Sequence, residues 1–167
     1  MSADEDFIRQ LARALREARL EAVLVGTGAA ILQGVPLLTE DLDLLVRDTP
    51  LVKKKLDRLA RELGGAWIEI SPVTRARRLV GLRAGVDVLF DRIAGDLRFE
   101  SLRARALRIR LGDEVIVAAS LEDVIRSKQA ADREKDRAQL PILRDALRVK
   151  EAAAQVPRRP KRKGSGR

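Results

Sequence analysis

The segment VGTGAAILQGVPLLTEDLDLLV, at residues 25–46, decides how the whole chain is interpreted. It follows a short apolar run, residues 21–25, that predicts a buried strand stopped by Gly26. It ends in a second predicted strand, residues 42–47, which contains Asp43 and directly follows Asp41. Side chains alternate across a strand, so both aspartates point to one face, ~7 Å apart at Cα. Because like charges repel, the pair indicates either a solvated strand face or part of a metal site.

Three neighbouring features favour the metal site. Gly26-Thr27-Gly28 follows a strand and opens a short helix, which presents backbone N–H groups and a hydroxyl suited to phosphate. A third aspartate, Asp87, lies in the predicted strand GVDVLF at residues 85–90. Residues 75–110 hold ten arginines against four acidic residues, so an anionic substrate near Asp87 would meet positive potential.

These residues predict a mechanism. Three carboxylates, from Asp41, Asp43 and Asp87, can hold one or two Mg²⁺ ions, or Mn²⁺ in their place, that bridge the oxygens of a nucleoside triphosphate. Asp87 stands apart from the pair and is the expected acceptor of a proton from an incoming hydroxyl.

The composition excludes several other classes of site. The chain has no cysteine and no histidine, so thiolate zinc sites, Ser-His or Cys-His nucleophile pairs and histidine acid–base chemistry are absent. Any metal must be held by oxygen ligands, which favours Mg²⁺ or a similar hard ion. Aromatic residues are only 2% of the chain, which argues against a surface built on base stacking.

The predicted elements alternate between helix and strand. Helices are expected at residues 4–19, 29–33 and 50–63, the last capped by Thr49 and ended by Gly64-Gly65. Strands are expected at 67–70, 77–82 and 85–90, with a hairpin at 104–118; residues 93–101 are ambiguous. Ser120 begins a helical stretch to about residue 154, broken near residues 131–132 or at Pro141. This order predicts an α/β (α+β) mixed sheet flanked by helices, with a helical C-terminal part at 120–154.

The 167 residues are expected to form one domain, residues 1–154, followed by a disordered basic tail at 155–167. The net charge is +9, and residues 157–167 contribute six basic residues and no acidic one. The tail is either an arm that binds nucleic acid or a solvated solubility tail. No apolar run is long enough to span a membrane and the N-terminus is polar and acidic, so the cytoplasm is the expected location.

The motifs carry a family resemblance. The run G-T-x(13)-D-L-D with a later V-D-V strand resembles the nucleotidyltransferase superfamily of DNA polymerase beta-like fold. VGTGA at residues 25–29, TEDLD at 39–43, SLEDVIRSK at 120–128 and ADREKD at 131–136 are similar to small prokaryotic members, including nucleotidyltransferase toxins of abortive-infection systems.

The resemblance implies an enzyme that transfers a nucleoside monophosphate from a triphosphate, with ATP expected, to a hydroxyl of RNA (including tRNA), protein or a small molecule. It implies that Gly26 and Thr27 form the phosphate turn, that Lys128 contacts a nucleotide phosphate and that Asp136 orients Lys128. It also suggests a toxin–antitoxin component masked by a cognate antitoxin. Because the chain has little room for a substrate domain, a partner or self-association is expected to complete the pocket.

The chain departs from the family pattern at several positions. Thr27 replaces a second Gly or Ser, Gln33 stands where histidine is common, and Gln139 replaces an expected aspartate. Leu37 or Leu38 stands where relatives often carry arginine. These departures bear on substrate contacts more than on metal binding. A non-catalytic nucleotide- or nucleic-acid-binding module of the same fold is the alternative.

Overall fold

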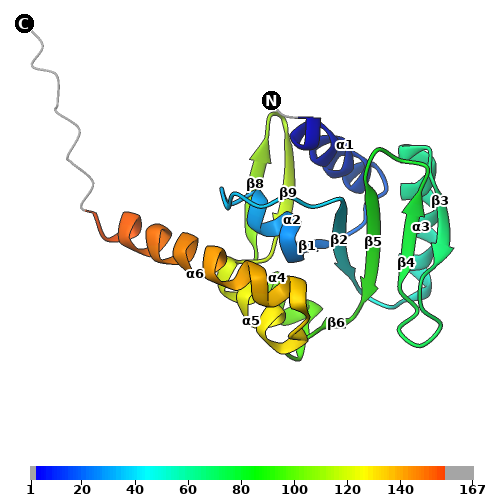
Figure 1. The fold of residues 1–167 in the computed structure, drawn as a ribbon. Helices are drawn as coiled ribbons and strands as arrows, with labels where there is room; N and C mark the ends of the chain where they lie inside the picture. Colours follow the sequence, from blue (N-terminus) through cyan, green and yellow to red (C-terminus); the bar gives the residue numbers. More distant parts are fainter. Residues whose placement is uncertain (1–2, 157–167) are drawn as a thin grey trace, which may run out of the picture.

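The computed structural model describes residues 3–156, which form a mixed sheet with helices packed around it (Figure 1). Of the tail predicted at residues 155–167, residues 157–167 lie outside the described residues, and Gln155 is the last residue of a helix, which corrects the predicted boundary. The elements, in chain order, are α1 (Ala3–Glu17), β1 (Val23–Val25), α2 (Gly26–Ile31), β2 (Asp41–Val46), α3 (Pro50–Leu63), β3 (Ala66–Glu69), β4 (Arg77–Val80), β5 (Gly85–Phe90), β6 (Arg92–Ile93), β7 (Leu97–Arg98), α4 (Phe99–Arg105), β8 (Leu107–Leu111), β9 (Glu114–Ala118), α5 (Leu121–Ala131) and α6 (Glu134–Gln155).

The main sheet has the strand order β3-β4-β5-β2-β1-β9-β8. Two neighbouring pairs are parallel, β2 with β5 and β1 with β9, and the other pairs are antiparallel. The mixed α/β architecture with a helical C-terminal part is therefore confirmed. Figure 1 shows α6 extending away from the sheet at the end of the described chain.

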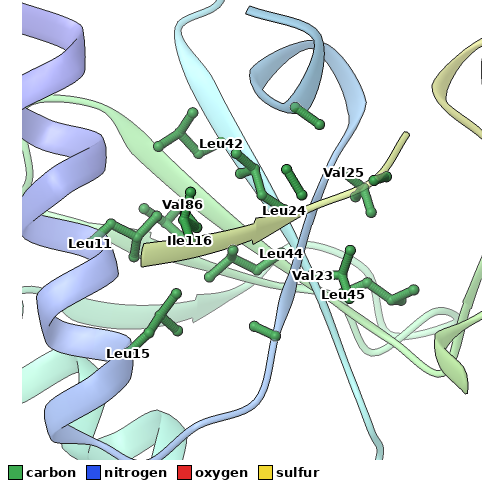
Figure 2. Close-up of a cluster of buried hydrophobic side chains, with 14 of the residues drawn as sticks. Leu11, Leu15, Val23, Leu24, Val25, Leu42, Leu44, Leu45, Val86 and Ile116 are labelled. Atoms are coloured by element: carbon green, nitrogen blue, oxygen red, sulfur yellow. The ribbon is translucent and has the colours of Figure 1, made fainter. Parts of the chain in front are cut away.

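Buried side chains lie on both faces of this sheet, and α1 covers the face that carries Leu44 and Val86. Figure 2 shows Leu11 and Leu15 of α1 beside Leu44, Val86 and Ile116 of the strands, and all five side chains are buried. Because side chains alternate along a strand, the neighbours of Leu44 and Val86 in sequence point to the opposite face. That second face of β2 and β5 is where the three aspartates lie.

The predicted caps of α3 and α5 are those that the structure has. The Thr49 hydroxyl accepts a hydrogen bond from the Val52 N–H at the start of α3, and Gly64 ends this helix with φ +74°. Ser120 accepts from the Asp123 N–H at the start of α5. Such contacts satisfy backbone groups that have no partner inside the helix, so these positions could be predicted from residue type.

Three expectations needed correction or were left open. α2 begins at Gly26, three residues before the predicted start, although Gly26 itself has a φ of +65°. The C-terminal helical stretch breaks at Asp132, where φ is +49°, while Pro141 lies inside α6 without ending it. The ambiguous residues 93–101 fall in the small β6–β7 hairpin, with a turn at Gly95 and Asp96, and in the first turn of α4. No helix between residues 3 and 156 is long and apolar enough to cross a membrane.

Candidate active site

Strand register brings the three predicted carboxylates together. β2 and β5 run parallel with Asp43 directly opposite Asp87, while Asp41 lies opposite Gly85. Opposite residues of neighbouring strands project from the same face, so the three aspartates form one cluster on the face opposite to Leu44 and Val86. The sequence predicted all three aspartates, and the pairing of β2 with β5 shows that the third lies beside the other two.

The cluster opens into a cavity of about 1090 Å³. Its walls come from the β2 and β5 strands, the β3–β4 loop, the residues after β5, and helices α2, α5 and α6. All of the predicted site residues line it, together with cationic side chains that the sequence did not single out. The predicted residues are Gly26, Thr27, Asp41, Asp43, Asp87, Lys128 and Asp136. The additional cationic residues are Arg75, Arg78, Arg92, Arg133 and Lys135.

Arg78 of β4 is the principal site residue that sequence reasoning missed. It lies directly opposite Asp87 in the antiparallel β4–β5 pair. Its Nε donates to Asp87 Oδ1 at 2.6 Å and its Nη2 to Asp87 Oδ2 at 2.8 Å, a two-point contact. The same Nη2 also donates to Asp41 Oδ2 at 3.0 Å. These hydrogen bonds, with Asp87 the main partner, raise the pKa of Arg78, so the guanidinium stays charged.

Asp43 has no such partner and its pKa is raised to about 6. Burial is the main cause, because it disfavours the charged form, and the charges of Asp87 and Asp41 add to it. Lys128 and Arg133 act in the opposite direction. Asp43 is therefore the carboxylate of the cluster that most lacks a compensating cation.

Two glycines allow the carboxylates to approach the backbone closely. At Gly26, where φ is +65°, a Cβ atom would lie 2.8 Å from Asp43 Oδ2. At Gly85 a Cβ atom would lie 2.3 Å from Asp41 Oδ1. Both distances are below van der Waals contact, so any side chain at either position would displace an aspartate of the cluster.

Two residues that depart from the family pattern, Thr27 in the predicted phosphate turn and Gln139, contact each other. The hydroxyl of Thr27 is buried and donates to Gln139 Oε1 of α6 at 3.1 Å. The larger residue at 27 and the amide at 139 thus form one hydrogen-bonded pair that links α2 to α6. This contact had no signal in the sequence, because the two residues are far apart in the chain.

Lys128 and Asp136 form a buried ion pair at the helical wall of the cavity. Lys128 Nζ donates to Asp136 Oδ1 at 3.0 Å, and both side chains are more than nine-tenths buried. Arg133, which the sequence analysis did not assign, donates from Nε to Asp136 Oδ2 at 2.6 Å. Burial opposes ionisation of Asp136, but the hydrogen bonds from Arg133 and Lys128 outweigh it and lower its pKa. Lys128 and Arg133 thus keep positive charge near Asp43.

The remaining departures lie away from the carboxylates. Gln33 donates from Nε2 to the carbonyls of Ala29 and Ala119, and its Oε1 accepts from Lys150 Nζ. It therefore joins the end of α2 to β9 and α6. Leu38 is 87% exposed in the loop before β2, while Leu37 packs against the core.

The donor set of the cluster suits a hard divalent cation, since three carboxylates supply oxygen ligands and Asp43 carries uncompensated charge. In the present arrangement, however, the described residues include no group of three such side chains close enough to share one ion. Arg78 engages two of the three carboxylates. Asp41, Asp43 and Asp87 would hold the ion, and the guanidinium would have to move.

Comparison with solved structures defines the class of fold. The chain is similar to the antibiotic-resistance factor ANT(2″)-Ia in its solution structure (TM-score 0.59, 17% identity, 90% of this chain and 94% of that chain). It is similar to the crystal structure of ANT(2″)-Ia in complex with adenylyl-2″-tobramycin (TM-score 0.63, 14% identity, 92% and 94%). It also resembles a Thermotoga maritima chain described as a nucleotidyltransferase (TM-score 0.56, 17% identity, 90% and 92%).

The chain thus has the fold of the nucleotidyltransferases, as its motifs predict. No model of a protein family matches the sequence, and no curated protein matches it closely enough to count as a relative. The fold is shared along nearly the whole length of the compared chains although few residues are identical.

The raised pKa of Asp43 predicts a pH-dependent effect on stability. Its protonated form stabilises the folded state fully below pH 3.8, and this contribution is lost as the pH rises through about 6. Asp43→Asn, which cannot ionise, should therefore raise the free energy of unfolding by roughly 1–3 kcal/mol at pH 8 without divalent metal. The gain should largely vanish at pH 4. Urea unfolding at both pH values measures it.

Asp57→Asn is the matched control, because Asp57 is exposed on α3, on the other side of the sheet. It should change stability little at either pH. Loss of stability in Asp43→Asn at pH 8, or an equal gain at both pH values, would contradict the assigned environment of Asp43.

Proposed function

We propose that this chain is a Mg²⁺-dependent nucleotidyltransferase that moves a nucleoside monophosphate from a nucleoside triphosphate to a hydroxyl group. The observation that carries this proposal is the cluster of Asp41, Asp43 and Asp87 on adjacent strands at the floor of one cavity. A purely structural sheet has no reason to place three mutually repelling carboxylates there. The nucleotidyltransferase fold supports the same reading.

The metal, held by Asp41, Asp43 and Asp87, would neutralise phosphate charge and stabilise the attacking and leaving oxygens of an in-line displacement. The chain's own residues orient the reactants around it. Asp87 is the proposed acceptor of the hydroxyl proton. Both of its oxygens now accept hydrogen bonds from Arg78, so it can take a proton only after one oxygen is released.

The helical wall of the cavity would hold the phosphates. Lys128 and Arg133 share Asp136 as their partner, which fixes both cations toward the cavity at no cost in unpaired buried charge. Gly26 offers a backbone without a side chain next to Asp43, so a phosphate can approach the carboxylate cluster closely. Thr27 supports this turn through its hydrogen bond to Gln139.

ATP is the proposed donor. A chain of the same fold holds adenylyl-2″-tobramycin, an adenylated small molecule. The acceptor here can be RNA, protein or a small molecule, and RNA fits best with the arginines at the mouth of the cavity. Arg75 and Arg92 line this cavity and are about two-thirds exposed. The proposed biological role is that of a toxin whose activity is masked by a cognate antitoxin until the two separate.

A non-catalytic nucleotide-binding module is the second candidate. The observation that favours it is the Arg78 contact, which pairs one guanidinium with two of the three carboxylates without any metal. In such a module the aspartates would position an arginine instead of a cation cofactor. Catalysis and binding can be separated by the following experiment.

Nucleotidyl transfer is tested by incubating the full chain with Mg²⁺, total RNA and each labelled triphosphate in turn. Asp41→Ala and Asp43→Ala should reduce incorporation at least ~100-fold, because each removes a ligand of the proposed metal. Asp57→Ala, which removes an exposed carboxylate on α3, should leave incorporation unchanged. Incorporation is measured on gels and as acid-precipitable label.

The enzyme proposal fails if no triphosphate is incorporated into RNA, protein or a small-molecule acceptor and the aspartate variants still bind nucleotide normally. That result would favour the binding module. Transfer at wild-type rates in Asp43→Ala would instead mean that the carboxylate cluster is not the reaction centre.

The basic tail gives a separate prediction for RNA binding. Removing residues 157–167 deletes six basic residues and no acidic one. If the tail contacts phosphates, RNA affinity should fall and should depend less steeply on salt concentration, by a slope of roughly 0.7 for each lost contact to single strands. Fluorescence anisotropy at several salt concentrations measures both quantities. An unchanged slope would leave the tail without a role in RNA binding.

A further inference from the structure

We propose that Arg78 is a positioning residue whose guanidinium occupies the place of a cation between Asp41 and Asp87, and that it withdraws when a divalent metal binds. The inference rests on the proposed function, because it concerns the same metal site. It adds a residue and a competition that neither the motifs nor the fold assigns.

The first argument is the position of the guanidinium within the row of aspartates. Across the sheet, Asp43 on β2 faces Asp87 on β5, and Asp87 faces Arg78 on β4. Arg78 makes a two-point hydrogen bond to Asp87 and a third bond to Asp41. Such forked contacts are the strong form of an arginine–carboxylate pair, so Arg78 sets the positions of both acids.

The second argument is the space above Gly85. This residue lies between Asp41 on β2 and the β4 strand that carries Arg78. A Cβ atom here would collide with Asp41 Oδ1 and would lie 3.7 Å from Arg78 Nε. Because glycine leaves that space open, Arg78 can reach diagonally past its direct partner to Asp41. The backbone is thus shaped to let one guanidinium bridge both acids.

The third argument is that guanidinium and metal exclude each other. A Mg²⁺ ion lies about 2.0–2.1 Å from its carboxylate oxygens. The bridging nitrogens of Arg78 lie 2.6–3.0 Å from the oxygens of Asp87 and Asp41. Both cations would then lie within about 3–4 Å of each other, where repulsion is strong. This repulsion favours the withdrawal of Arg78 from at least one of the two acids when a metal binds.

The guanidinium has room to leave. The side chain of Arg78 is 33% exposed and lines the large cavity, so withdrawal does not require the core to open. Asp87, by contrast, is only 13% exposed and stays on the sheet. In the free chain Arg78 relieves carboxylate repulsion at Asp41 and Asp87, while Asp43 remains uncompensated.

The test is a titration of the metal-free full chain with Mn²⁺ and no nucleotide, following free Mn²⁺ by electron paramagnetic resonance. Arg78→Ala should bind Mn²⁺ at least ~10-fold more tightly than the wild type, because it removes a cation that competes for the same oxygens. Arg77→Ala is the matched control: Arg77 neighbours Arg78 on β4 and lies opposite Val88, away from the carboxylates. It should change affinity less than ~2-fold.

A second readout covers the folding of the variant. Without metal, Arg78→Ala should unfold at a lower temperature than the wild type, since Asp41 and Asp87 are left without their counterion. Saturating Mn²⁺ should restore most of the lost stability. Arg78→Lys, which keeps the charge but cannot make a forked contact, should bind Mn²⁺ with intermediate affinity.

Several outcomes would overturn the inference. Unchanged or weaker Mn²⁺ binding in Arg78→Ala, with binding still lost in Asp43→Asn, would mean that Arg78 stays in place when the metal is bound; the proposed function would stand. An equal gain in Arg77→Ala would reduce the effect to overall charge. Absence of Mn²⁺ binding in the wild type and in every variant would contradict this inference and the proposed metal site together.

Discussion

The parallel pairing of β2 with β5 is the constraint on which the rest of the site depends. These strands are separated in the chain by α3, β3 and β4, and a parallel pair needs such a long crossover connection. The pairing places Asp43 opposite Asp87. The alternating face of the same strands carries Leu44 and Val86 into the core beside α1. One register therefore fixes the faces of both sets of side chains, and a shift by one residue would exchange them.

Local chemistry explains why much of the fold could be predicted. The caps at Thr49 and Ser120 and the strand at Gly85–Phe90 follow from residue type and period, because each involves neighbours in sequence. The grouping of Asp41 and Asp43 follows from the two-residue period of a strand. Arg78 could not be found in this way. Residues 75–110 hold ten arginines, and only the register of β4 against β5 distinguishes this one.

The residues that depart from the family pattern also make contacts that the sequence could not predict. In the sequence, Thr27 and Gln139 are two separate substitutions, and each puts a substrate contact in question. In the fold they are one hydrogen bond between α2 and α6. Gln33 likewise binds two backbone carbonyls and Lys150. Residues that differ from a motif can thus form new structural contacts with each other while the carboxylates beside them keep their arrangement.

Charge compensation links the stability of this site to its proposed chemistry. A row of carboxylates on a half-buried sheet face needs a cation in order to remain ionised and close together. Arg78 supplies that cation from inside the chain for Asp41 and Asp87, and Lys128 with Arg133 moderates Asp43 from the helical wall. A divalent metal ion would satisfy the same demand more completely, because it carries twice the charge of a guanidinium. The residue that stabilises Asp41 and Asp87 is therefore the one with which a metal competes. The affinity for metal then measures how much more strongly the carboxylates bind the metal than the guanidinium.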